Sequence, residues 1–199
     1  LASVPPACLH AASVRVGPSA PVDEVEIVNQ ADGISRGRLP DGASAYADFP
    51  DTPTPGASNY LPLLDVVINE VLAHTDAPLE DAIEIRNISD TEINVGGWLL
   101  GDTPSGATRF EIPADTKIAP GGYAVFYEGS FNAGGTGFSL NSAHGDTVYL
   151  TATDADGNPT GYRVVKPVPP TANGVSVGRV PTSQGWKFAA LTRRTYGSD

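Results

Sequence analysis

The sequence predicts an all-β fold, an antiparallel β-sandwich of about nine short strands. Three observations lead to this prediction. Residues 64–199 contain many short runs rich in β-branched and aromatic residues. Turn dipeptides, such as Pro120-Gly121 and Asp156-Gly157, separate these runs. No stretch of twelve residues shows the 3.6-residue apolar period of an amphipathic helix.

The expected strands follow one another at short intervals, at residues 65–72, 82–88, 95–100, 109–112, 123–127, 147–151, 162–165, 175–179 and 186–188. In the second strand the alternation places Ile83 and Ile85 on one face and Glu84 and Arg86 on the other. The apolar positions predict a core between two sheets. Its expected members are Ile68, Val71, Ile83, Ile85, Trp98, Leu100, Phe110, Val125, Val148, Leu150 and Val177.

The first sixty residues have a different character. Residues 1–24 show little periodicity, and we expect a linker or irregular segment there, or strands too short to identify. Residues 25–28 alternate as a strand does. Residues 50–62 contain four prolines, which predicts a stiff, extended linker.

An internal repeat relates this part of the chain to its end. The segment Gly33-Ile-Ser-Arg-Gly-Arg-Leu-Pro40 matches Gly174-Val-Ser-Val-Gly-Arg-Val-Pro181, which lies 141 positions later. In the same register Thr54-Pro-Gly56 falls on Thr195-Tyr-Gly197. The repeat predicts that residues 25–59 are the C-terminal strands of a preceding unit plus a Pro-rich linker, and that residues 64–199 are the next whole unit. Because the sequence has no methionine, we expect it to be a piece of a longer chain containing a tandem array.

From about residue 66 to residue 199, the sequence resembles the lamin tail domain family in an ordered set of motifs. The first are Val67-Ile-Asn-Glu-Val71, Glu84-Ile-Arg-Asn87 and Val95-Gly-Gly-Trp-Leu-Leu-Gly-Asp102. The later ones are Phe110-Glu-Ile-Pro113, Ile118-Ala-Pro-Gly-Gly-Tyr-Ala-Val-Phe126, Leu140-Asn-Ser-Ala-His-Gly-Asp-Thr-Val-Tyr-Leu150, Asp154-Ala-Asp-Gly157 and Gly174-Val-Ser-Val-Gly-Arg179.

The resemblance implies an immunoglobulin-like β-sandwich. It also implies a non-catalytic module, since similar bacterial domains occur in secreted and surface proteins beside CotH-type kinase, nuclease or phosphatase domains. No catalytic residue is carried over from the family. We therefore expect a module that spaces domains or holds a protein or glycan partner, and not an enzyme. The alternatives are a calcium-dependent adhesion module or an accessory domain of an exported enzyme.

One loop has a spacing that suits a cation. Asp154, Asp156 and Asn158 have the one-three-five spacing that opens a calcium loop, and calcium needs six to eight oxygen ligands. The rest of an EF-hand loop is missing, because its sixth and twelfth positions are Pro159 and Val165. We expect a hairpin turn here, with calcium as the alternative and no other cofactor.

The remaining candidate site residues are two clusters of charged residues and three histidines. Asp76, Glu80, Asp81 and Glu84 form an acidic cluster that we expect to be a solvated loop. The basic end contains Arg163, Lys166, Arg179, Lys187, Arg193 and Arg194, which suits either charge complementarity with the acidic middle of the domain or an anionic partner. The histidines, His10, His74 and His144, have no metal-binding spacing, and Ser142 beside His144 lacks a nucleophile elbow.

Composition excludes several classes of function. The chain has 12 Lys and Arg against 23 Asp and Glu, a net charge of −11, which argues against nucleic acid as a partner. The single cysteine, Cys8, excludes an intrachain disulfide, and no apolar run is long enough to span a membrane. An acidic chain that avoids cysteine and lysine suits an extracellular or cell-surface bacterial protein, with neighbouring domains of the same chain as its nearest partners.

Overall fold

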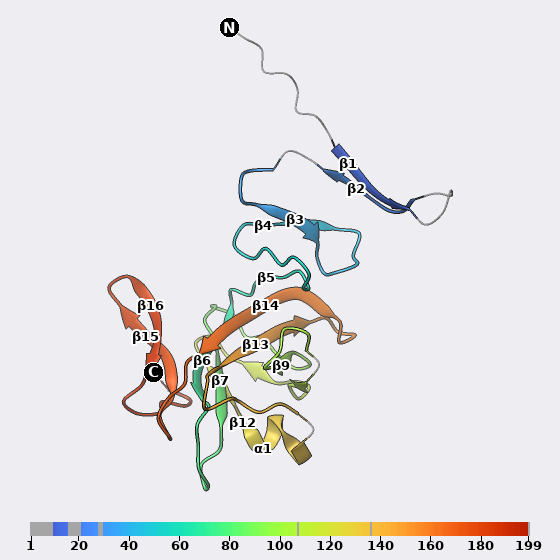
Figure 1. The fold of residues 1–199 in the computed structure, drawn as a ribbon. Helices are drawn as coiled ribbons and strands as arrows, with labels where there is room; N and C mark the ends of the chain where they lie inside the picture. The colour runs from blue at the N-terminus through green and yellow to red at the C-terminus, as the bar shows by residue number, and fades with distance from the viewer. Residues whose placement is uncertain (1–9, 16–20, 28–29, 107, 136, 199) are drawn as a thin grey trace.

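The computed structural model describes residues 10–15, 21–27, 30–106, 108–135 and 137–198. Most of the chain forms a β-sandwich of two five-stranded sheets, with two further hairpins at the N-terminal side (Figure 1). This confirms the predicted immunoglobulin-like, all-β architecture. No helix among the described residues is long and apolar enough to cross a membrane.

The first sheet has the strand order β12-β7-β6-β15-β16 and is antiparallel throughout. Its strands are β6 (Val66–Leu72), β7 (Ala82–Asn87), β12 (Tyr123–Tyr127), β15 (Val177–Thr182) and β16 (Gly185–Ala190). Strand β15 pairs with β6 through Val177 and Gly178 alone, so the rest of the β15–β16 hairpin projects beyond the sheet (Figure 1).

The second sheet has the order β10-β9-β13-β14-β5. Its strands are β5 (Leu61–Pro62), β9 (Leu99–Gly101), β10 (Arg109–Glu111), β13 (Asp146–Thr153) and β14 (Pro159–Val168). All pairs are antiparallel except β5 with β14, where Leu61 lies opposite Tyr162 in a parallel register. Smaller elements are β8 (Ile93–Asn94) paired with β11 (Lys117–Ile118), helix α1 (Glu128–Phe131) and a 3₁₀ turn (Ala133–Gly135).

The core lies between the two sheets. Ile68 and Ile85 lie opposite each other on β6 and β7, and both are fully buried. Leu100 and Leu150, paired across β9 and β13, contribute from the other sheet and are also fully buried. Each such side chain stabilises the fold by about 1.5–3 kcal/mol relative to an exposed one. Most of the predicted core is confirmed, and it is extended by residues that were not predicted: Val66, Val95, Ile112, Ile118, Phe131, Phe138, Leu140 and Val168.

The predicted strand at residues 95–100 is wrong in its first half. The N–H of Trp98 donates to the carbonyl of Val95 at 3.1 Å, and Gly97 has a φ of +82°. These residues therefore form a turn, and β9 begins only at Leu99. Gly96 is required there, because a Cβ would lie 2.7 Å from the backbone nitrogen of Asp115. Trp98 is half-buried and packs against the edge of the core rather than between the sheets.

Strand β12 differs from the prediction in phase. Val125 was expected in the core, but it is only partly buried, and the neighbouring Phe126 belongs to the core. All five residues of the strand, Tyr-Ala-Val-Phe-Tyr, are apolar or aromatic. An uninterrupted apolar run gives no alternation from which a face could be assigned.

The N-terminal part forms two antiparallel hairpins. Strands β1 (His10–Arg15) and β2 (Pro21–Ile27) pair where a linker or irregular segment was one expectation, so the alternative of short strands is the correct one for these residues. Residues 1–9, with Cys8, and 16–20 lie outside the described residues. Strands β3 (Ser35–Arg38) and β4 (Tyr46–Phe49) form the second hairpin, which lies between β1–β2 and the β5–β14 edge of the sandwich (Figure 1).

The two repeated segments share their local structure. Each begins with a turn in which the fourth residue donates to the first, Ile34 to Ala31 at 3.2 Å and Val175 to Ala172 at 3.1 Å. The glycine at the third position has a positive φ in both turns, +80° at Gly33 and +73° at Gly174. Such a backbone conformation favours glycine over any other residue.

The two hairpins that follow these turns also correspond. Arg38 lies over the ring of Tyr46 at 4.8 Å from the centroid, and Arg179 lies over the ring of Trp186 at 4.7 Å. The arginines are repeat equivalents, and in both cases the ring belongs to the start of the second strand of the hairpin. A cation over an aromatic face is worth about 0.5–1 kcal/mol at an exposed site.

The third correspondence is the Thr-x-Gly turn. Ala57 donates to the carbonyl of Thr54 at 3.0 Å, and Ser198 donates to the carbonyl of Thr195 at 2.9 Å. The third residue of each turn is a glycine with a positive φ, +78° at Gly56 and +75° at Gly197. The two segments are thus alike in turn, hairpin and closing turn.

In the C-terminal copy, this closing turn covers two buried glutamates. Glu70 and Glu84 are paired across β6 and β7, and both are fully buried. The hydroxyl and the N–H of Thr195 donate to Oε2 of Glu70 at 2.7 and 3.0 Å, and the N–H of Gly197 donates to Oε2 of Glu84 at 2.6 Å. The hydroxyl of Ser176 donates to the other oxygen of Glu70 at 2.6 Å. We call this set of contacts the glutamate latch, and it fastens the C-terminal segment to the sheet.

The latch leads to a stability prediction. The Thr195→Val substitution keeps the shape of the side chain and removes the hydroxyl that donates to Glu70, so we expect the free energy of unfolding to fall by about 1–3 kcal/mol. The matched control is Thr192→Val, an exposed threonine of the same segment, which should change it by less than about 0.5 kcal/mol. Urea denaturation of both variants measures this, and equal effects would contradict the latch.

A second prediction concerns pH. Burial raises the pKa of Glu84, and the neighbouring Glu70 raises it further, while hydrogen bonds from Gly197 and Asn69 oppose the shift. A carboxyl with a higher pKa in the folded than in the unfolded chain binds its proton more tightly when folded. Wild type should therefore gain stability relative to Glu84→Gln as the pH falls from 7 towards 4.5, by on the order of 1 kcal/mol per unit of pKa difference. Denaturation curves at several pH values test this, and a change of opposite sign would show a lowered pKa.

Candidate functional site

The N-terminal hairpins are joined to the sandwich by a short, well-bonded connection. After β4, the hydroxyl of Thr52 donates to the carbonyl of Tyr60 at 2.7 Å. The chain then enters β5, whose two residues pair with β14, and the N–H of Leu63 donates to the carbonyl of Arg163 at 3.0 Å. Because β5 continues the sheet, the Pro-rich linker ends in regular hydrogen bonding and not in a free hinge.

The β3–β4 hairpin itself contacts the sandwich at Gly161 of β14. Gly161 is buried, with a φ of +86°, and a Cβ at this position would overlap the side chain of Leu39 and come within 3.4 Å of Cα of Pro40. A glycine here thus permits both the backbone conformation and the close approach of the hairpin. We call this region, with β5 and the Leu39–Gly161 contact, the joint.

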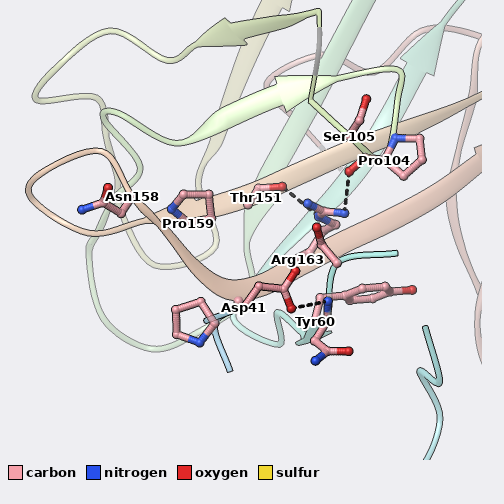
Figure 2. A pocket seen from close by; sticks show the side chains of 12 residues that line it. Asp41, Tyr60, Pro104, Ser105, Thr151, Asn158, Pro159 and Arg163 are labelled. Carbon is pink, nitrogen blue, oxygen red and sulfur yellow. Dashed lines mark hydrogen bonds between the residues drawn. The ribbon is translucent and has the colours of Figure 1, made fainter. Parts of the chain in front are cut away.

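A pocket of about 360 Å³ lies at the joint (Figure 2). One wall comes from the N-terminal segment and the other from the loops and strand of the sandwich. The lining residues are Pro40, Asp41, Ser58, Asn59, Tyr60, Pro104, Ser105, Thr151, Asn158, Pro159, Gly161 and Arg163. The volume is within the range of small-ligand pockets.

Arg163 is the central residue of this pocket (Figure 2). Its Nε donates to the hydroxyl of Thr151 at 2.9 Å, and one terminal nitrogen donates to the carbonyl of Pro104 at 3.1 Å. Its guanidinium lies 5.6 Å from the ring centroid of Tyr60 and 5.8 Å from that of Tyr149. Arg163, on β14, therefore connects the linker to β13 and to the loop between β9 and β10.

The guanidinium is half-buried, and this burial lowers the pKa of Arg163, although the charge of Asp41 is among the groups that oppose the shift. Within the described part of the chain, Arg163 makes no ion pair. Asp41 directs one carboxylate oxygen to the N–H of Asn59 at 3.1 Å, across the same pocket (Figure 2). The pocket thus contains a cation whose two recorded hydrogen-bond partners are neutral oxygens.

The predicted calcium loop forms the turn between β13 and β14. One carboxylate oxygen of Asp154 accepts the N–H groups of Asp156 and Asn158, both at 2.9 Å, and the other accepts the side-chain amide of Asn158 at 3.3 Å. These bonds, with that to the backbone of Asn158 first, lower the pKa of Asp154. Asp154 thereby organises its own turn, as aspartate does in Asx turns. The described residues contain no group of three His, Cys, Asp or Glu side chains that could hold a metal ion.

The acidic cluster is not a single group. Asp81 is buried and accepts the hydroxyl of Thr75 at 2.8 Å, and burial raises its pKa. Glu80 accepts the N–H of Gly129 at 2.9 Å, and Asp76 accepts the side-chain amide of Asn173. The fourth member, Glu84, belongs to the latch. The prediction of one solvated acidic loop therefore holds only for the exposed Asp76 and Glu80.

The basic end is also divided. Arg163 lies in the pocket, whereas Lys166 and Arg179 lie at the projecting hairpin, over the rings of Phe188 and Trp186. Burial lowers the pKa of Lys166, and the nearby Arg179 lowers it further. Arg194 donates to the carbonyl of Gly174 at 3.1 Å. Arg163 and Arg194 thus have partners of their own, whereas Lys166 and Arg179 lie near each other on the rings of β16.

The histidines are placed apart. Nδ1 of His74 is 2.8 Å from the carbonyl oxygen of Thr171, and His144 is exposed on the loop before β13. His10 belongs to β1. No hydrogen bond joins Ser142 to His144 among the described residues.

Sequence reasoning missed the pocket. It placed Arg163 in the basic end, Asn158 in the calcium loop and Tyr60 in the linker, without bringing them together. The signal that was overlooked is Gly161 inside an otherwise strand-like segment, since a glycine in a strand often marks the close approach of another backbone.

Calcium stays the alternative to a plain hairpin turn at this loop, and a metal-binding measurement decides between them. Because the oxygens of Asp154 already accept bonds from the turn, we expect the midpoint of thermal unfolding to be the same in millimolar calcium and in excess chelator. A ligand present at a hundred times its dissociation constant would add about 2.7 kcal/mol and raise the midpoint by several degrees. Such a rise, absent in an Asp154→Asn, Asp156→Asn variant, would establish the calcium site instead.

Comparison with known proteins gives one result beyond the geometry. Residues 62–164 match the family model described as Lamin Tail Domain. No curated protein and no solved structure matches the chain. The match begins at β5 and ends within β14, so it contains β6, β7 and β12 of the first sheet and most of the second sheet. Because it covers more than half of the 199 residues and agrees with the sandwich described above, the chain belongs to the lamin tail domain family.

Proposed function

We propose that this protein is a non-catalytic module of a tandem array in a multidomain bacterial secreted or cell-surface protein, where it spaces domains and offers a surface to a protein or glycan. The family supports the non-catalytic, interacting character. Position in an array and location outside the cell are inferences from the repeat and from the acidic, cysteine-poor composition.

The observation that carries the proposal is the joint. The β3–β4 hairpin has the turn, the cation–aromatic contact and the closing turn of the β15–β16 unit, and it is seated on the edge of the sandwich that follows it in the chain. In this interpretation, the end of one unit is fastened directly to the next. A parallel β pair, a buried glycine contact and Arg163 over Tyr60 replace a flexible linker.

Such a joint would fix the angle between successive units. A Gly/Ser-type linker of similar length behaves as a random coil, and its ends sample a wide range of distances. Here the residues between β4 and β5 are held at Thr52, Asn59 and Tyr60 by hydrogen bonds and packing. A rigid joint would hold neighbouring domains at a fixed distance and angle, which is the role of a non-catalytic spacer.

The test measures the joint directly. Spin labels at Ser44→Cys on the hairpin and Asp90→Cys on the sandwich, both exposed, report the distance between the two parts, with Cys8→Ser to remove the native thiol. We expect a narrow distance distribution for this background. Gly161→Ala should broaden it, because the added Cβ overlaps Leu39.

The matched control is Gly157→Ala. Gly157 has a similar φ, +80°, but a Cβ there meets no atom within 4 Å. Both substitutions carry the backbone penalty of a left-handed conformation, about 1–2 kcal/mol, whereas only Gly161→Ala displaces the hairpin. A broad distribution in the background protein, or equal broadening in both variants, would refute the rigid joint.

A further inference from the structure

The pocket at the joint contains a charged group that a purely structural joint would not require. A rigid joint is satisfied by apolar packing and backbone pairing, yet this pocket contains a half-buried guanidinium. Removing a charge from water without an opposite charge is unfavourable. Arg163 uses Nε and one terminal nitrogen for Thr151 and Pro104, and no bond to its other terminal nitrogen is found in the described part of the chain.

Asp41 is the nearest acidic candidate for a partner, and it is engaged elsewhere. It lines the same pocket, and its charge acts on Arg163. However, no ion pair within 4.0 Å joins the two side chains among the described residues, and Asp41 accepts the N–H of Asn59. The guanidinium therefore keeps free donors in a recess that an anion can enter, and planar bidentate donors suit a carboxylate.

The rest of the lining suits a hydroxylated ligand. Hydroxyl and amide groups come from both walls. Asn59, Thr151 and Asn158 already hydrogen bond within the chain, but each keeps a further donor or acceptor for a ligand. Pro159 lies between Asn158 and Thr151, and Pro104 lies beside Ser105, so apolar rings alternate with polar groups (Figure 2). The polar members are Ser58, Asn59, Ser105, Thr151 and Asn158, and the prolines are Pro40, Pro104 and Pro159.

We propose that the pocket at the joint binds an acidic saccharide unit, a uronic acid residue of a glycan, with its carboxylate on Arg163 and its hydroxyls on the surrounding amides and hydroxyls. This goes beyond the proposed spacing function, because it gives the joint a ligand of its own. Since the pocket is lined by both parts of the chain, the ligand would bridge the hairpin and the sandwich.

The experiment titrates the full chain with digalacturonate and follows binding by calorimetry and by the NMR signal of Arg163 Nε–H. The neutral disaccharide digalactose and the dipeptide Glu-Glu are titrated in parallel. We expect saturable binding of digalacturonate, with a Kd of about 1 mM or tighter, and binding at least about tenfold weaker for digalactose and Glu-Glu.

Two variants localise the site, and one serves as control. Arg163→Gln removes the charge and should weaken binding at least about tenfold. Since this variant also loses its contacts with Tyr60 and Thr151, Ser105→Phe fills the mouth of the pocket from an exposed loop position and leaves Arg163 in place. Lys117→Gln, which removes an exposed cation of the β8–β11 pair, should leave the affinity unchanged.

The outcomes separate the possibilities. No binding of digalacturonate, equal binding of digalactose, or full affinity in Ser105→Phe each overturns the proposal. Equal or tighter binding of Glu-Glu overturns the saccharide and assigns the pocket to an acidic peptide. The spin-label distances are measured without ligand, so a negative titration leaves the rigid joint standing, and a broad distance distribution leaves the titration result standing.

Discussion

The structure of the sandwich depends on how two neighbouring carboxylates are accommodated out of contact with water. Glu70 and Glu84 lie side by side, and every recorded donor to them is neutral: a backbone N–H, a hydroxyl or an amide. A buried carboxylate that loses these donors costs several kcal/mol, so the donors have to be supplied whenever the domain folds. Two of the donor residues, Thr195 and Gly197, lie far from β6 and β7 in sequence and arrive only when the C-terminal segment is in place.

This requirement defines where the unit ends. The family match stops at residue 164, but the latch uses residues 195–197 and the core uses Val177. A unit cut at residue 164 would leave both carboxylates exposed or unsatisfied and would remove the two strands β15 and β16 from the first sheet. On physical grounds we therefore expect the folding unit to run from β5 to the closing turn.

In the N-terminal copy of the closing turn, an asparagine takes the place of the buried glutamate as the hydrogen-bond acceptor. The hydroxyl of Thr54 donates to Oδ1 of Asn59 at 2.7 Å, where its equivalent in the other copy donates to Glu70. A Cβ on Gly37 would contact Asn59, just as one on the equivalent Gly178 would approach Cβ of Glu70. Asparagine carries no charge, so the N-terminal copy has no buried carboxylate for its closing turn to satisfy.

Sequence and structure agree where a residue's environment is set by alternation or by turn chemistry. The core-facing side of β7 was predicted because Ile83 and Ile85 alternate with charged residues. The phase of β12 was not predictable, because an unbroken apolar run has no alternation, and the turn at Gly96–Trp98 was missed because its apolar residues read as a strand. The pocket was beyond sequence reasoning for another reason. Tyr60 and Arg163 are about a hundred positions apart, and only the parallel pairing of two residues of β5 with β14 brings them together.

Although the charge along the chain is uneven, the cationic side chains contact aromatic rings and carbonyl oxygens more often than carboxylates. Residues 61–162 contain 3 basic and 15 acidic residues, and residues 163–199 contain 6 basic and 1 acidic. Instead of meeting these carboxylates, Lys166, Arg163 and Arg179 lie over aromatic faces within 6 Å, and in the N-terminal copy Arg38 does the same. Cation–aromatic contacts bury the long apolar stems of these side chains, and at Arg163 they leave donors of the guanidinium available. At the joint these donors line a pocket, and this position is what makes a structural arginine a candidate binding group.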